Sequence, residues 1–213
     1  MKHWLVFALC WLASGAWGAE SKLEKIEVRT DFPILERGLE TVMTVCLGCH
    51  GLKYIKFRDL AGLGIAKDKV DGWRGANPMG TAIGSQMSAD AALQAFGTVP
   101  PDLSLMTKAR EGGPHYVYAF LAGFYTNDKG KPDNKIFPGT KMPDVMGVAF
   151  ATGAERTAIE NKAKEVASFL EWAGDPKAQE RRELGIYVIA YLIVLTILLY
   201  LVKCRTWARL KGH

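Results

Sequence analysis

The chain has 213 residues, of which 49% are hydrophobic and 23% charged, so it can bury a core and is not a disordered chain. The formal net charge is +5, but all 22 acidic residues and 22 of the 27 basic residues lie between Ala19 and Glu183. This long middle part is formally neutral. The basic excess therefore lies at the two ends, where it indicates membrane topology rather than nucleic-acid binding.

An export signal is predicted at residues 1–18. It has a basic start at Lys2 and His3, an apolar run, and the small residues Ala16 and Gly18 at the predicted cleavage site. A retained amino-terminal anchor is the alternative, although the apolar run is short for a span of the bilayer.

A Cys-x-x-Cys-His motif follows at Cys46, Cys49 and His50, at the end of a helix predicted over 36–52. Cysteines three apart share one helical face, so both thiols can reach the vinyl groups along one edge of a haem, and the histidine can then ligate the iron. An accidental pair of reduced cysteines beside a histidine is one alternative. Half of a zinc site is another, but such a site needs about four ligands. The remaining cysteines lie in apolar terminal segments: Cys10 and Cys204. The motif predicts one covalently bound haem c.

The next stretch carries few signals. Residues 53–71 are predicted to form turns at the surface with at most a short helix, and no chemistry is assigned to them. Ser88 is a predicted N-cap for a short helix over 89–96. Pro114 occupies a favourable first position for a helix over 115–124.

Four residues in this region are candidates for contact with a haem. Pro100 and Pro101 fix an extended segment that could line a flat apolar ligand, although a rigid turn explains them equally well. Arg110 could hold a haem propionate through two parallel hydrogen bonds, or it could lie in solvent. His115 could be a second axial ligand, but a histidine at the start of a helix is more often an ordinary surface residue.

Met142 is the predicted sixth ligand of the iron. It lies in a loop stiffened by Pro138 and Pro143, which can hold a thioether sulfur against the open side of the metal. Ligation by histidine and methionine together raises the reduction potential. A methionine more often simply fills a core. Five other methionines compete for the position, with Met146 next after Met142: Met43, Met79, Met87, Met106 and Met146.

A long final helix is predicted for the exported domain. Thr152 and Glu155 form a capping-box pattern, and the apolar periodicity continues to about Ala173. This helix and the one that carries the motif would cross to close a mostly α, cytochrome c-like domain over residues 19–175.

A membrane anchor is predicted after a polar linker at 176–183. Residues 184–202 are nineteen residues without a charge, the length of helix that crosses the hydrocarbon core. Residues 203–213 contain four Lys or Arg residues, against two just before the span. The positive-inside rule therefore places the carboxyl terminus in the cytoplasm and the haem domain outside the membrane.

Together these residues resemble the cytochrome c1 family, the haem subunits of ubiquinol:cytochrome c oxidoreductases (cytochrome bc1 complexes), in a compact bacterial form. The marks of the resemblance are the motif from Val45 to His50 and four further features: Pro100-Pro101-Asp102-Leu103-Ser104, Ala109-Arg110 with Gly112-Gly113, Phe137-Pro138-Gly139 before Met142-Pro143, and Asp175-Pro176 with Arg181-Arg182 before a single anchor. The resemblance implies that Cys46 and Cys49 carry the haem, that His50 and Met142 ligate its iron, and that Arg110 and Tyr125 contact a propionate.

The family also implies a function: relay of single electrons, with no bond-making chemistry in this chain. The expected partners are cytochrome b, a Rieske iron-sulfur protein as donor, a periplasmic cytochrome c as acceptor, and the lipid of the bacterial inner membrane. No nucleic-acid partner is expected. Two alternatives stay open. One is a different membrane-anchored monohaem cytochrome c, either a shuttle or an oxidase subunit, and the other is a haem-based sensor with an open sixth position.

Overall fold

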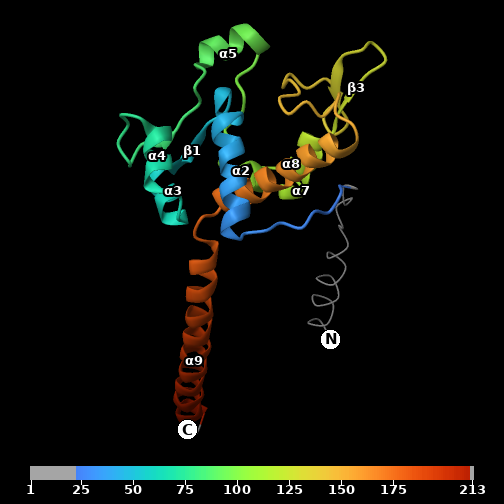
Figure 1. The fold of residues 1–213 in the computed structure, drawn as a ribbon. Helices are drawn as coiled ribbons and strands as arrows, with labels where there is room; N and C mark the ends of the chain where they lie inside the picture. The colour runs from blue at the N-terminus through green and yellow to red at the C-terminus, as the bar shows by residue number, and fades with distance from the viewer. Residues whose placement is uncertain (1–22, 212–213) are drawn as a thin grey trace, which may run out of the picture. The chain divides into compact units, whose positions relative to one another are not determined.

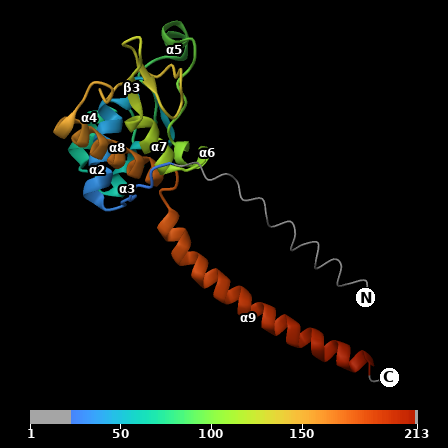
Figure 2. The ribbon, with the colours of Figure 1, turned by 90° about the vertical axis from the view of Figure 1, so that its right-hand side faces the viewer.

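The structure, a computed structural model, describes residues 23–211 and divides at Gly174 into two units (Figures 1 and 2). The predicted signal at residues 1–18 lies outside the described residues. The first unit is mostly helical with a few short strands, as the sequence predicts, and the second is a single long helix.

Two helices far apart in the sequence form the centre of the first unit. Helix α2 (Phe32–Thr44) crosses helix α8 (Gly153–Ala173), as Figure 1 shows. At the crossing, a Cβ atom added to Gly38 would lie 2.2 Å from the backbone oxygen of Glu165. The backbones therefore approach as closely as a glycine allows. Apolar side chains of both helices are almost fully buried around this point: Leu35, Leu39, Val42, Val166, Phe169 and Leu170.

Helix α7 (Pro114–Ala122) packs along α8, and the short helix α6 (Met106–Ala109) joins them. Pro114 is at the start of α7, as predicted. The hydroxyl of Thr107, which is buried, donates a hydrogen bond to the Leu170 carbonyl at 3.3 Å. This hydrogen bond holds α6 against the carboxyl half of α8.

The region after the Cys-x-x-Cys-His motif contains more structure than predicted. Strand β1 (Leu52–Lys56) pairs with β2 (Ala82–Ile83) in an antiparallel ladder, and helices α3 (Phe57–Leu63) and α4 (Lys67–Arg74) lie between them in sequence. Apolar side chains of this region join the core: Leu52, Ile55, Phe57, Leu60, Ile65 and Val70. The prediction of surface turns was therefore wrong here, because short elements with a distant strand partner leave little local pattern.

Helix α5 (Ala89–Phe96) is confirmed, and the Ser88 hydroxyl accepts a hydrogen bond from the Ala91 N–H as an N-cap. Strands β3 (Phe124–Thr126) and β4 (Pro132–Asn134) form a second antiparallel pair. Helix α8 has the predicted bounds, but the Thr152 side chain makes no capping hydrogen bond, so the predicted capping box does not form.

The second unit contains helix α9 (Ala178–Lys211), which is long and apolar enough to cross a membrane. The helix already includes most of the predicted linker at 176–183 and continues beyond residue 202. Asp175 forms an ion pair with Arg181 in the first turns, close to the positive amino-terminal end of the helix, where a carboxylate is favoured. The long apolar helix fits a single-pass membrane anchor.

Candidate haem site

The Cys-x-x-Cys-His motif lies just beyond the end of α2 rather than within a continuous helix. Helix α2 ends at Thr44, and Cys46–Gly48 form a single 3₁₀ turn, η2. The Cys46 carbonyl accepts hydrogen bonds from the N–H groups of Cys49 at 3.1 Å and His50 at 2.9 Å. The predicted helix over 36–52 was therefore too long at its carboxyl end. The tighter turn nonetheless keeps the two cysteines and the histidine together at the wall of one cavity.

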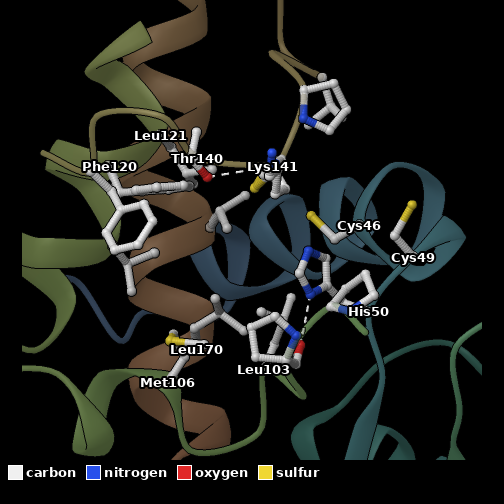
Figure 3. Close-up of a pocket in the computed structure, with 18 of the residues that line it drawn as sticks. Cys46, Cys49, His50, Leu103, Met106, Phe120, Leu121, Thr140, Lys141 and Leu170 are labelled. Carbon is white, nitrogen blue, oxygen red and sulfur yellow. Dashed lines mark hydrogen bonds between the residues drawn. The ribbon is translucent and has the colours of Figure 1, made fainter. Parts of the chain in front are cut away.

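This cavity has a volume of about 560 Å³ and lies between the motif, the segment at residues 96–101, helices α6 to α8 and the loop at 137–145. Figure 3 shows Cys46, Cys49 and His50 along one side and Met106, Phe120 and Leu170 on the opposite side. Most of the lining side chains are apolar or aromatic. Such a wall suits a large, flat and mainly apolar ligand.

The orientation of His50 is fixed by a hydrogen bond. Its Nδ1 atom lies 2.7 Å from the backbone oxygen of Pro101 (Figure 3). A carbonyl oxygen can only accept, so Nδ1 must carry the proton and donate it. In the neutral imidazole, the other ring nitrogen, Nε2, then has a free lone pair, which is the state that a metal-ligating histidine requires. The predicted role of Pro101 as a wall residue is thus joined by a second one, as the acceptor that sets the histidine tautomer.

Met142 lines the cavity, and so does Met106 on α6, whereas Met146 does not. The labelled neighbours of Met142, Thr140 and Lys141, lie on the other side of the cavity from Met106 (Figure 3). The Thr140 hydroxyl accepts a hydrogen bond from the Met142 N–H at 3.3 Å. Of the methionines that compete for the sixth position, Met106 is therefore a stronger rival than Met146.

The loop that carries Met142 contains no helix or strand and is held by side chains instead. Asn134, which is fully buried, donates from Nδ2 to the Phe120 carbonyl at 2.7 Å. Its Oδ1 accepts the N–H groups of Ile136 and Phe137 at 2.9 and 3.1 Å. Asp133 accepts the N–H groups of Gly139 and Asn134, and these bonds hold the pKa of its carboxyl below the usual value. The loop is thus tied to α7 at the cavity wall.

Among the described residues, the charged side chains of the cavity wall are both cationic: Arg110 and Lys141. The Arg110 guanidinium also lies 5.9 Å from the centre of the Tyr116 ring, which is itself part of the wall. Tyr125 is not among the lining residues and lies on β3 opposite Asp133. Lys141 and Tyr116 were missed from the sequence, because a lysine or a tyrosine in a polar stretch carries no signal of its own.

His115 was a further candidate for an iron ligand, and its contacts show a different role. His115 does not line the cavity, and its Nδ1 accepts the N–H of Ile26 at 3.1 Å, so this histidine ties down the amino-terminal segment instead. Within residues 23–211, no group of three or more His, Cys, Asp and Glu side chains has the arrangement of a metal-ion site.

The two motif cysteines are free thiols. Burial raises the pKa of the Cys46 thiol to about 11, and the neighbouring Cys49 adds to the shift. Cys46 is therefore a neutral thiol at neutral pH. Two thiols, an imidazole nitrogen with a free lone pair, an apolar wall, a thioether and two cations together match an iron porphyrin with two vinyl groups and two carboxylates.

Comparisons with known proteins agree with this chemistry. Residues 22–81 and 73–210 match the sequence model of the Cytochrome C1 family. The chain is similar to cytochrome c1 of Allochromatium vinosum, with 34% identity over 92% of this chain and 91% of that protein. It is also similar to cytochrome c1 of Rhodospirillum rubrum, with 30% identity over 86% of this chain and 84% of that protein. A third relative, cytochrome b/c1 of Bradyrhizobium diazoefficiens, is 34% identical over 82% of this chain, which spans 33% of that longer protein.

Proposed function

The chain belongs to the cytochrome c1 family, and on this basis we propose that it relays single electrons from a Rieske iron-sulfur subunit to a periplasmic cytochrome c. Family membership makes it a haem-bearing electron-transfer subunit of a bc1 complex with cytochrome b as a partner. The observation that carries the proposal further is the hydrogen bond from His50 to Pro101, because it leaves Nε2 free beside two cysteine thiols.

Each residue of the site has a proposed task. Cys46 and Cys49 would hold the haem as thioethers, and His50 and Met142 would ligate its iron. Arg110 binds a propionate, for which its place on the cavity wall is the support. Contact of Tyr125 with a propionate is proposed on the family resemblance alone.

The haem supplies a one-electron couple, and the chain supplies its surroundings. The apolar wall, with Pro100 among its residues, would exclude water from the iron. The Pro101 carbonyl accepts a hydrogen bond from His50 Nδ1 and so fixes the orientation of the imidazole. With both His50 and Met142 bound to the iron, the haem would be suited to electron transfer rather than to binding of a ligand.

The proposed topology follows from charge and length. Residues 19–175 form the haem domain in the periplasm, α9 spans the bacterial inner membrane, and the basic end lies in the cytoplasm. The anchor keeps the haem domain at the membrane surface, where the donor operates.

Isolation of the native complex tests the function. A tagged full-length chain, extracted from membranes in mild detergent, is expected to bring b-type haem and quinol:cytochrome c reductase activity with it. An equally tagged, unrelated single-pass membrane protein is the control. Recovery of c-type haem alone in repeated preparations would support a different anchored cytochrome c, and rapid binding of carbon monoxide by the reduced protein would support a sensor.

Replacement of one motif cysteine tests the attachment. The Cys49→Ala variant is expected to keep haem through a single thioether, so that the band of its reduced pyridine haemochrome moves to longer wavelength, because one vinyl group stays conjugated with the ring. Absorption spectra of denatured protein measure the shift. Cys204→Ala, which removes a thiol on α9, is the matched control and should leave the spectrum unchanged. An unshifted Cys49→Ala spectrum would contradict the attachment.

A further inference from the structure

The residue after Pro101 is tied to the strand that follows His50. The Asp102 carboxylate accepts two backbone hydrogen bonds, one from the Lys53 N–H to Oδ2 at 2.8 Å and one from the Ser104 N–H to Oδ1 at 3.0 Å. The first of these crosses between two chain segments, and the second shapes the loop itself. One side chain thus links the loop at 100–104 to β1.

Three more contacts reinforce this link. The Ser104 hydroxyl, fully buried, accepts the Tyr54 N–H at 3.1 Å. The Leu103 N–H donates to the Gly51 carbonyl at 2.8 Å. A Cβ atom added to Gly51 would lie 3.1 Å from Asp102 Oδ2, so the two segments pack tightly. We call this set of contacts between residues 51–54 and 102–104 the clasp.

The clasp determines where the Pro101 carbonyl points. The ring of Pro101 fixes its φ angle, and a proline has no N–H with which to anchor itself. The direction of its carbonyl is therefore set by the neighbouring residues. The residue that follows it in the chain, and shares the peptide group of that carbonyl, is Asp102. Since the clasp fixes Asp102 relative to Gly51, the residue next to His50, it also holds the Pro101 oxygen at 2.7 Å from His50 Nδ1.

We propose that Asp102 is a positioning residue for His50: through the clasp it holds the Pro101 carbonyl as the hydrogen-bond acceptor of Nδ1 and so keeps Nε2 free to ligate an iron. Asp102 is not among the residues that line the cavity, so it acts through Pro101 rather than by contact with the haem. The inference rests on the proposed role of His50 as an iron ligand. Groups behind a metal ligand act in this way, by fixing its orientation and its protonated nitrogen.

The test observes the His50 Nδ1 proton itself. The full-length, reduced holoprotein is labelled with ¹⁵N-histidine and studied by NMR in detergent, which is practical because the chain has four histidines. Asp102→Ala removes both acceptor oxygens and is expected to speed solvent exchange of the Nδ1 proton by about tenfold or more, by analogy with the effect that loss of such supporting partners has on metal affinity and activity. Asp102→Asn keeps one acceptor oxygen and should give a smaller increase.

The matched control is Thr107→Val. It removes a buried hydrogen bond to Leu170 a few residues along the same segment but leaves the clasp intact. It should lower thermal stability without faster exchange of the Nδ1 proton. Lys53→Ala is a second control, because Lys53 contributes only its backbone N–H to the clasp.

Two results would overturn the proposal. One is an Nδ1 proton in Asp102→Ala that exchanges at the wild-type rate. The other is an Nδ1 proton in Thr107→Val that exchanges faster, in proportion to the stability which that variant has lost. If Asp102→Ala does not accumulate, Asp102→Asn and Ser104→Ala decide in the same way, since each removes one bond of the clasp. Failure of the proposed function is seen separately, because an unligated His50 would show no iron-dependent chemical shift in the wild-type protein, whatever its exchange rate.

Discussion

Replacement of Met142 by leucine is expected to lower the reduction potential by on the order of 100 mV and to let the reduced iron bind carbon monoxide. A thioether favours reduced iron, and leucine has nearly the same shape but no ligating atom. The side chain lies on the cavity wall, so the substitution should preserve packing while it removes the ligand. Redox titration of the c-type haem and carbon monoxide difference spectra measure the two effects.

Two methionines provide matched controls. Met106→Leu changes another methionine of the same wall, and Met146→Leu changes one outside it; neither should move the potential by a comparable amount. A large fall in potential with Met106→Leu and none with Met142→Leu would move the sixth ligand to α6.

Gly38→Ala is expected to destabilise the first unit by about 3 kcal/mol, at the upper end of the cost of overpacking a core. The new Cβ would meet the Glu165 backbone oxygen at 2.2 Å and its carbon at 2.7 Å, and backbone atoms cannot rotate away as a side chain can. Helices α2 and α8 would have to separate, which loosens the wall that carries the motif. Denaturant unfolding of the full-length protein in detergent, followed by the Soret band and by circular dichroism, measures the loss.

Gly72→Ala in α4 is the control for the substitution itself. Its added Cβ would have no neighbour within 4 Å, so the better helix propensity of alanine should raise stability by about 0.5–1 kcal/mol. Equal stabilities of Gly38→Ala and the wild-type protein would mean that the two helices are less closely packed than the structure shows.

The sequence identified those residues of the site that belong to a short motif with a characteristic spacing. Cys46, Cys49 and His50 could be predicted because their spacing alone matches a haem, and all three line the cavity. Lys141 could not be predicted, because its place on the wall depends on the course of the loop. That course is set by the buried Asn134, which looks in the sequence like an ordinary turn residue.

The fold shows the same division. Helix α8 was predicted with its observed bounds because its apolar periodicity is long. Strand β1 was missed because its ladder partner β2 lies about thirty residues away and has only two residues. The end of α2 was placed too far along, since the apolar pattern continues through η2 although the hydrogen bonding changes there.

The irregular loop of Met142 has a thermodynamic consequence. The loop contains no helix or strand, so its backbone is not held by regular hydrogen bonding. If Met142 is the ligand, the iron–sulfur bond is one of the interactions that hold the loop in place. A ligand that raises the potential must, around a closed cycle, bind the reduced metal more tightly than the oxidised one. For each 59 mV by which Met142 raises the potential, the free energy needed to detach the loop from reduced iron is about 1.4 kcal/mol larger than that needed to detach it from oxidised iron. The rigidity of this segment then depends on the oxidation state.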